Sequence, residues 1–198
     1  MMKLDMIITG VGGQGVILAS DIISDTALAA GYDVKKTDTI GMAQRGGSVV
    51  SHIRISSKVW SPLIREGEAD ILLGFEKLES ARWGYFLRPG GAAIINNFDL
   101  PPLSVSTGIE PYPSDEKVTA ILKQRTDVIH FIDGTQLAKE TGNFRAYNTL
   151  LLGCLSKLTP FEEDFWKESI SKHLAAGLRD INLAAFARGR NIMEHPGL

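Results

Sequence analysis

Three glycines, Gly10, Gly12 and Gly15, follow the short apolar stretch at residues 6–9 and precede a stretch with helical spacing. Their spacing is G-x-G-x-x-G. Glycine lets the backbone turn tightly and approach a ligand, and the N–H groups at the start of a helix carry a partial positive charge that suits phosphate. The pattern predicts a phosphate-binding loop, although the same glycines equally suit close packing of the helix on the sheet.

A second glycine-rich segment, residues 41–47, carries Gln44 and Arg45 and is followed by Ser48. A guanidinium holds a carboxylate or phosphate with two hydrogen bonds, and the other two side chains could add neutral donors. We therefore hypothesise that Arg45 faces an anionic group, and an ion pair within its own fold is the alternative. The candidate ligand-binding residues are Gly10, Gly12, Gly13, Gln14, Gly15, Gln44, Arg45, Gly46, Gly47 and Ser48.

Four further polar residues each follow a predicted strand: Asp38, Glu76, Asn96 and Asp133. Because ligands bind outside the carboxyl ends of parallel strands, these residues are expected to meet at one edge with the glycine loops. Each also suits a helix cap or a turn. A nicotinamide site would need an acidic residue roughly 20 residues past the first loop, and Asp38 fits that position only loosely. A stand-alone NAD(P)-dependent oxidoreductase is thus the alternative function.

Composition excludes several other classes. The formal net charge of -2 argues against a nucleic-acid-binding protein. The single cysteine, Cys154, excludes a disulfide framework and an iron–sulfur cluster held by this chain alone, and it favours a cytoplasmic location. No apolar run reaches the length of a membrane span, so no membrane association is expected. His130, His173 and His195 lack metal-ligand spacing with one another, and His52 is an isolated histidine on a predicted strand, so we assign no metal site and no catalytic residue.

Short apolar runs alternate with helix-like stretches, which is typical of βαβ units. Strands are predicted at residues 6–9, 34–37, 48–55, 70–75, 92–95 and 128–132, and the third is a half-covered strand that could lie at a sheet edge. Helices are predicted at residues 16–30, from 77 to a break at 88–91, and at 115–124, 147–158 and 178–192. A further helix is expected to start at residues 159–162, with Thr159 as its cap. Gly189 is a weak point of the last helix. The expected fold is a three-layer, Rossmann-like α/β domain over residues 1–198, with a mostly parallel sheet, helices on both faces and a helical C-terminal portion.

Both glycine-rich segments resemble a known family. Residues 10–16, GVGGQGV, are similar to the opening of the gamma-type domain of 2-oxoacid:ferredoxin oxidoreductases. Residues 39–49, TIGMAQRGGSV, resemble the small subunit of the indolepyruvate branch. Residues 74–76, the run from 132 and residues 148–155 also resemble family segments, and the likeness extends to about residue 158.

The resemblance implies a non-autonomous enzyme subunit. Such enzymes convert a 2-oxoacid and coenzyme A into an acyl-CoA, carbon dioxide and reduced ferredoxin. It implies that thiamine diphosphate and the iron–sulfur clusters lie in a larger partner subunit, while the small chain completes the active-site crevice and helps to receive coenzyme A or the 2-oxoacid. Ferredoxin would be reached through the complex, and indolepyruvate or a related arylpyruvate is the expected substrate.

Overall fold

A computed structural model describes residues 2–41, 46–102, 105, 107–108 and 111–194 of the chain. Its centre is a six-stranded sheet in the order β2-β3-β1-β4-β5-β6. The strands are β1 (Lys3–Val11), β2 (Asp33–Ile40), β3 (Ser48–Ser56), β4 (Ala69–Gly74), β5 (Leu87–Asn96) and β6 (Val128–Ile132). The predicted α/β fold class is confirmed.

The sheet is mixed rather than uniformly parallel. Strands β1, β4, β5 and β6 run parallel to one another, as predicted for βαβ units. Strand β3 runs antiparallel to both β1 and β2. It follows β2 through a short connection and returns beside it, because a parallel pair would need a long crossover. The carboxyl end of β2 therefore lies at the same edge of the sheet as that of β1.

Strand β3 is an interior strand, and the prediction that it could lie at an edge was wrong. It lies between β1 and β2, and side chains on both of its faces are buried, including Val50 and His52 on one face and Ile53 on the other. Alternating polar and apolar residues suggested one exposed face. The polar members are accommodated because Ser51 donates to Asp38 at 2.6 Å and His52 accepts from the backbone N–H of Ile64.

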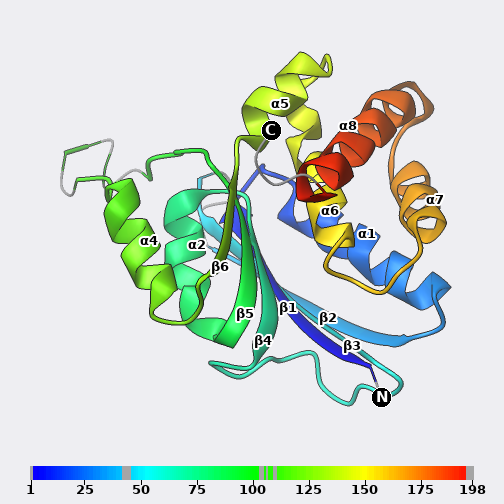
Figure 1. The fold of residues 1–198 in the computed structure, drawn as a ribbon, viewed down its shortest axis with the longest axis horizontal. Helices are drawn as coiled ribbons and strands as arrows, with labels where there is room; N and C mark the ends of the chain where they lie inside the picture. Colours follow the sequence, from blue (N-terminus) through cyan, green and yellow to red (C-terminus); the bar gives the residue numbers. More distant parts are fainter. Residues whose placement is uncertain (1, 42–45, 103–104, 106, 109–110, 195–198) are drawn as a thin grey trace.

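Helices cover both faces of the sheet, which gives the expected three layers (Figure 1). One face carries α2 (Lys77–Trp83) and α4 (Asp115–Lys123), and the other carries α1 (Val16–Ala29), α6 (Tyr147–Ser156), α7 (Glu163–His173) and α8 (Ala176–Glu194). Two hydrophobic clusters correspond to these faces, and the larger one joins the sheet to α1, α6, α7 and α8. Helix α5 (Gly134–Glu140) lies at the edge where β6 ends. The predicted helical C-terminal portion is confirmed.

Two local predictions were wrong. Residues 88–91, expected to break the chain after a helix, belong to β5, while the helix ends earlier in a 3-10 turn at Gly84–Phe86. The pairing of β5 with β4 is irregular there, which accommodates Pro89 and its glycines. Helix α7 begins at Glu163 after the N-cap Glu162, whereas the hydroxyl of Thr159 donates to the preceding turn. The later start leaves Phe161 free to pack into the core.

Cys154 lies in α6 and is fully buried against α8. Its Sγ lies 3.3 Å from the carbonyl oxygen of Gly189, and burial raises the pKa of the thiol to about 12. A thiol held neutral in this way is a poor nucleophile and metal ligand. Cys154 is therefore a core residue that joins α6 to α8.

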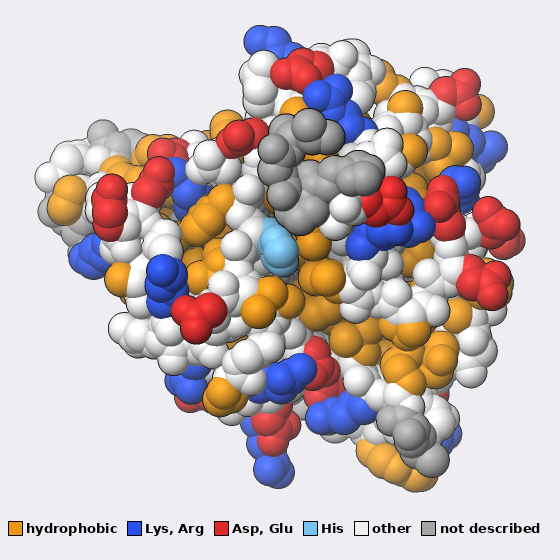
Figure 2. All heavy atoms as spheres, in the orientation of Figure 1, with side chains coloured by type: hydrophobic (Ala, Val, Ile, Leu, Met, Phe, Trp, Pro, Cys, Tyr) orange, Lys and Arg blue, Asp and Glu red, His pale blue; other side chains and the backbone are white. Residues whose placement is uncertain are grey.

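The two edges of the sheet differ in chemistry. Strand β2 carries Lys35, Lys36 and Asp38, which form ion pairs along its length. Strand β6 has no Lys, Arg, Asp or Glu and exposes Val128 and Phe131. Figure 2 shows the molecule from the side on which β6 lies in front. Hydrophobic side chains extend across the middle of this face, and charged side chains lie toward its outline. Within the described residues, no helix has both the length and the apolar character needed to span a bilayer.

Candidate functional site

The glycine loop lies where the carboxyl ends of β1, β4, β5 and β6 meet. Glu76 follows β4, Asn96 ends β5 and Asp133 follows β6, so these three residues lie at one edge as expected. The Nδ2 of Asn96 donates to Thr135 at 2.9 Å and to the carbonyl oxygen of Phe75 at 3.3 Å. This edge is the position where open α/β sheets place their ligands.

Asp38 is not part of that edge. It lies within β2, its carboxylate accepts a hydrogen bond from Ser51, and it pairs with Lys36 at 2.9 Å. The strand continues to Ile40, so Asp38 does not follow it as predicted. An acidic residue already held by two partners in a strand is a poor ribose ligand, and nothing in the described residues supports the stand-alone NAD(P) enzyme.

Gln14 fixes the glycine loop with its own side chain. Its Oε1 accepts from the backbone N–H of Val11 at 2.7 Å, and its Nε2 donates to the carbonyl oxygen of Phe75 at 3.2 Å. The residue is almost completely buried. Both polar atoms of the amide are thus hydrogen-bonded within the fold, and the role of Gln14 is to hold the loop in its conformation.

Gly15 is the N-cap of α1 and adopts the left-handed conformation, with φ of 83°. A Cβ at this position would lie 2.6 Å from the Nδ2 of Asn148 in α6. The neighbouring Tyr147 donates its hydroxyl to the carbonyl oxygen of Gln14 at 3.0 Å, and burial raises the pKa of this phenol. The left-handed backbone favours glycine here, and the nearby amide of Asn148 leaves little room for a Cβ, in addition to any role toward a ligand.

The second glycine-rich segment is held against the first. The N–H of Gly12 donates to the carbonyl oxygen of Gly47 at 2.8 Å, and that of Gly41 donates to the carbonyl oxygen of Ser48. The hydroxyl of Ser48 donates to the buried carboxylate of Glu79 at 2.5 Å. Gln44 and Arg45 lie outside the described residues. The two glycine segments that we predicted to share a site are therefore adjacent.

A cleft of about 650 Å³ opens between the glycine loop, the segment after β5 and the start of α6. Its wall combines backbone of the loop, apolar side chains and amides. Its lining residues are Gly12, Gly13, Gln14, Gly15, Leu18, Phe98, Leu100, Thr135, Asn143, Phe144, Arg145, Tyr147, Asn148, Leu174, Leu178 and Asn182. The cleft therefore offers both N–H donors and apolar surface to a ligand.

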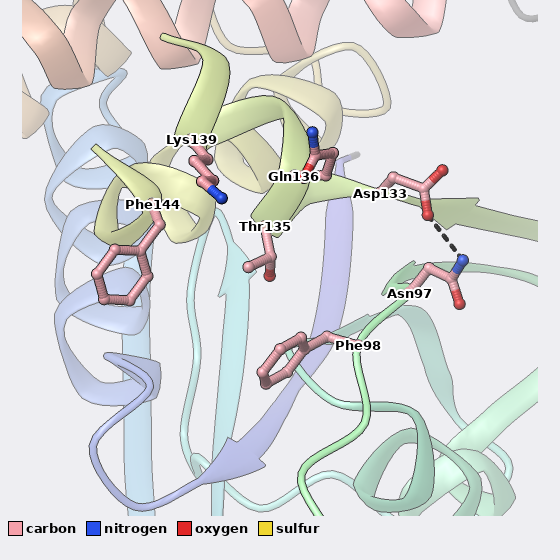
Figure 3. Close-up of a pocket in the computed structure, with 7 residues that line it drawn as sticks. All are labelled: Asn97, Phe98, Asp133, Thr135, Gln136, Lys139 and Phe144. Atoms are coloured by element: carbon pink, nitrogen blue, oxygen red, sulfur yellow. Dashed lines mark hydrogen bonds between the residues drawn. The ribbon is translucent and has the colours of Figure 1, made fainter. Parts of the chain in front are cut away.

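A neighbouring cavity of about 490 Å³ shares Phe98, Thr135 and Phe144 with the cleft. Figure 3 shows the two phenyl rings toward one end and the hydrogen bond between Asn97 and Asp133, 2.7 Å long, at the other. Lys139 from α5 points between them. This continuous surface was not predicted, because the aromatic and cationic residues on it have no motif spacing.

The arrangement suits the binding of an anionic ligand. Lys139 lines the smaller cavity and Arg145 lines the cleft, and the N-terminal N–H groups of α1 add partial positive charge. Among the described residues no group of three or more potential ligands could hold a metal ion. The site can therefore bind a ligand that has an anionic group and an apolar portion.

His52 lies away from the cleft, under Phe86 on the other face of the sheet. Its Nδ1 accepts the N–H of Ile64 at 3.3 Å, and burial lowers the pKa of the imidazole below 6.5. The unfolded chain takes up this proton near pH 6.5 and the folded chain does not. We expect the free energy of unfolding to fall as the pH drops below about 6.5. Urea unfolding at several pH values should show a smaller fall for His52→Gln; equal falls would contradict it.

Comparison with known proteins gives the family. The model of the pyruvate ferredoxin/flavodoxin oxidoreductase family matches residues 5–192. The chain belongs to this family. It is also 35% identical over 192 residues to indolepyruvate oxidoreductase subunit IorB of Pyrococcus horikoshii, a match that covers 96% of this chain and 95% of that protein.

Two solved structures share the fold. The gamma subunit of the keto/oxoacid ferredoxin oxidoreductase of Geobacter sulfurreducens superposes with a TM-score of 0.71 at 20% identity, over 96% of this chain and 98% of that one. A 2-oxoglutarate:ferredoxin oxidoreductase from Magnetococcus marinus, with 2-oxoglutarate, coenzyme A and succinyl-CoA bound, gives 0.74 at 23% identity, over 98% of this chain and 31% of that one. In the second case the likeness covers one part of a longer chain.

Proposed function

We propose that the chain is the small subunit of an indolepyruvate or arylpyruvate ferredoxin oxidoreductase. Near-full-length similarity to the Pyrococcus subunit carries this proposal. The reaction breaks the bond between the carboxylate and the 2-oxo carbon, releases carbon dioxide and joins the acyl carbon to the sulfur of coenzyme A. The thiol proton is released, and an electron pair passes to ferredoxin.

The redox groups belong to a larger partner subunit. Iron–sulfur clusters need several thiolates, and this chain has one cysteine, which is buried in α6. Thiamine diphosphate in the partner would supply the electron sink for decarboxylation. This chain's own contribution is to bind and orient a ligand at its edge, and ferredoxin would be reached through the complex.

Coenzyme A or the 2-oxoacid is the ligand we place in the cleft. Gly12, Gly13 and Gly15 would present backbone to it, and the side chain of Gln14 holds that loop in shape. Gly10, which is buried in β1 and packed against Gln14, would support the loop from behind. Gly46, Gly47 and Ser48 would support the adjoining segment, and Gln44 and Arg45 would contact an anionic group from there. An anionic ligand also suits the cationic side chains of Lys139, which lines the neighbouring cavity, and Arg145, which lines the cleft.

The partner is expected to cover the mouth of the cleft. Leu100, Phe144 and Leu178 line the cleft and remain exposed, Phe144 by 53%. Apolar side chains gathered around one opening are typical of a surface that another protein covers. We further propose that residues 1–198 act as one gamma-type domain and that the complex is cytoplasmic, as a lone unpaired thiol favours.

Co-expression with a candidate large subunit tests the function. The two chains should purify as a stable complex that reduces a dye only when both an arylpyruvate and coenzyme A are present, while the isolated small chain is inactive. Turnover by the isolated chain, or failure to associate, would overturn the proposal. A change in NADH fluorescence on adding the isolated chain would instead favour the nicotinamide alternative.

A further inference from the structure

The two walls of the cleft are hydrogen-bonded to two consecutive residues just after β4, one wall to Phe75 and the other to Glu76. The carbonyl oxygen of Phe75 accepts the Nε2 of Gln14, which shapes the glycine loop, and its N–H donates to Thr9 at 2.8 Å. Glu76, the next residue, reaches the opposite wall with its side chain. This junction therefore lies between the glycine loop and the segment that faces it.

The carboxylate of Glu76 is 1% exposed and its two oxygens have separate tasks. Oε2 accepts the backbone N–H of Glu79 at 2.7 Å and caps α2. Oε1 accepts the N–H of Leu100 at 3.3 Å and the hydroxyl of Tyr112. One oxygen is thus used within its own helix, and the other holds residues far along the chain.

The first turn of α2 holds that segment at several further points. The N–H of Lys77 donates to the carbonyl oxygen of Phe98 at 3.3 Å, and its ammonium pairs with Asp99 at 2.8 Å. The hydroxyl of Tyr112 also accepts the N–H of Leu78 at 3.3 Å. Burial and the adjacent carboxylate raise the pKa of Tyr112, so the phenol stays protonated and donates.

Phe98 and Leu100 are the residues of this segment that line the cleft. Leu100 is 37% exposed and packs poorly against the fold, so hydrogen bonds rather than burial hold its backbone. Removing the acceptor leaves the Leu100 N–H and the Tyr112 hydroxyl without this partner, and only the contacts of Lys77 with Phe98 and Asp99 then hold the segment against α2.

We infer that Glu76 is a positioning residue that sets the distance between the Phe98–Leu100 wall and the glycine loop, and so the affinity of the cleft for coenzyme A. The inference rests on the proposed function. Glu76 touches no reacting group, so it acts through the wall that it holds. Misplacing that wall weakens ligand binding more than the chemical step.

The assembled complex carrying Glu76→Gln tests this. Glutamine keeps the size but has one oxygen, so it cannot accept at both positions. We expect the KM for coenzyme A to rise about tenfold while kcat changes much less, and the amides of residues 98–100 to exchange hydrogen faster. Tyr112→Phe removes one donor only and should give a smaller change in the same direction. Glu168→Gln, the same change at an exposed carboxylate of α7, is the matched control.

Unchanged exchange at residues 98–100, or faster exchange with an unchanged KM, would overturn the inference. If Glu76→Gln fails to fold, Tyr112→Phe alone decides by the same two measurements. A wrong proposed function would give a different result. In that case, adding saturating coenzyme A to the wild-type complex would not slow the hydrogen exchange of the amides of residues 12–15. The exchange of residues 98–100 in the variants is measured without ligand and does not depend on that result.

Discussion

Replacing Gly189 with alanine is expected to destabilise the chain by about 3 kcal/mol. A Cβ on Gly189 would lie 1.9 Å from the carbonyl oxygen of Leu150 and 2.8 Å from its carbonyl carbon. Both atoms are backbone of α6, so no side-chain rotation relieves the overlap and the two helices must separate. Gly153 makes the same contact from the other side, with a Cβ position 2.1 Å from the carbonyl oxygen of Phe186. Separation would also loosen Trp166 and the buried cluster around α6 and α8.

Gly177→Ala is the matched control because it lies in the same helix. A Cβ there meets nothing within 4 Å, so this variant keeps its stability or gains slightly from the better helix propensity of alanine. For a chain of this size, 3 kcal/mol corresponds to a fall in Tm of roughly 6–12 °C. Thermal unfolding followed by circular dichroism measures it, and equal Tm values for the two variants would contradict the prediction.

The sequence predicted most elements of this fold because apolar runs and glycine breaks are local signals. Strands β4 and β6 and helices α1, α4, α6 and α8 lie close to their predicted ranges. What it could not predict is strand order. The antiparallel return of β3 depends on pairing with β1 and β2, and its alternating polar residues indicated an edge because the partners of Ser51 and His52 come from other elements. Gly189 was predicted to weaken α8 because glycine has a low helix propensity. Its close contact with α6 could not be predicted, because α6 lies far away in the sequence.

The candidate site was predicted only in part, because local sequence signals do not show which distant residues come together. Glycine spacing after a strand gave the loop at its observed edge, since that geometry is set within a few residues. The contacts of Gln14 and Ser48 were not predicted, because their partners lie far away in the sequence: Phe75 directly follows β4 and Glu79 lies in α2. Phe144 and Arg145 carry no pattern at all, and only the fold brings them to the loop.

Gly15→Ala is expected to raise the KM of the assembled enzyme for coenzyme A by about tenfold or more, through two separable effects. Alanine in the left-handed region at φ of 83° costs roughly 1–2 kcal/mol. Its Cβ would also lie 2.6 Å from the Nδ2 of Asn148, whose Oδ1 is held by the N–H of Thr149 at 2.7 Å. Either the loop moves or Asn148 turns into the cleft, and both disturb the surface that we propose binds the ligand. Steady-state kinetics of the complex with varied coenzyme A measures the effect.

Two further variants separate the clash from the strain. Gly13→Ala also needs a positive φ, of 102°, but a Cβ there meets nothing within 4 Å, so it tests strain alone and should raise KM less. Combining Gly15→Ala with Asn148→Ala removes the clashing amide, so the double variant should be less impaired than the two single effects added together. Additive effects would mean that the left-handed backbone, and not the approach of α6, is why glycine is needed at this position. In that case the close packing of α6 on the loop would have no part in shaping the cleft.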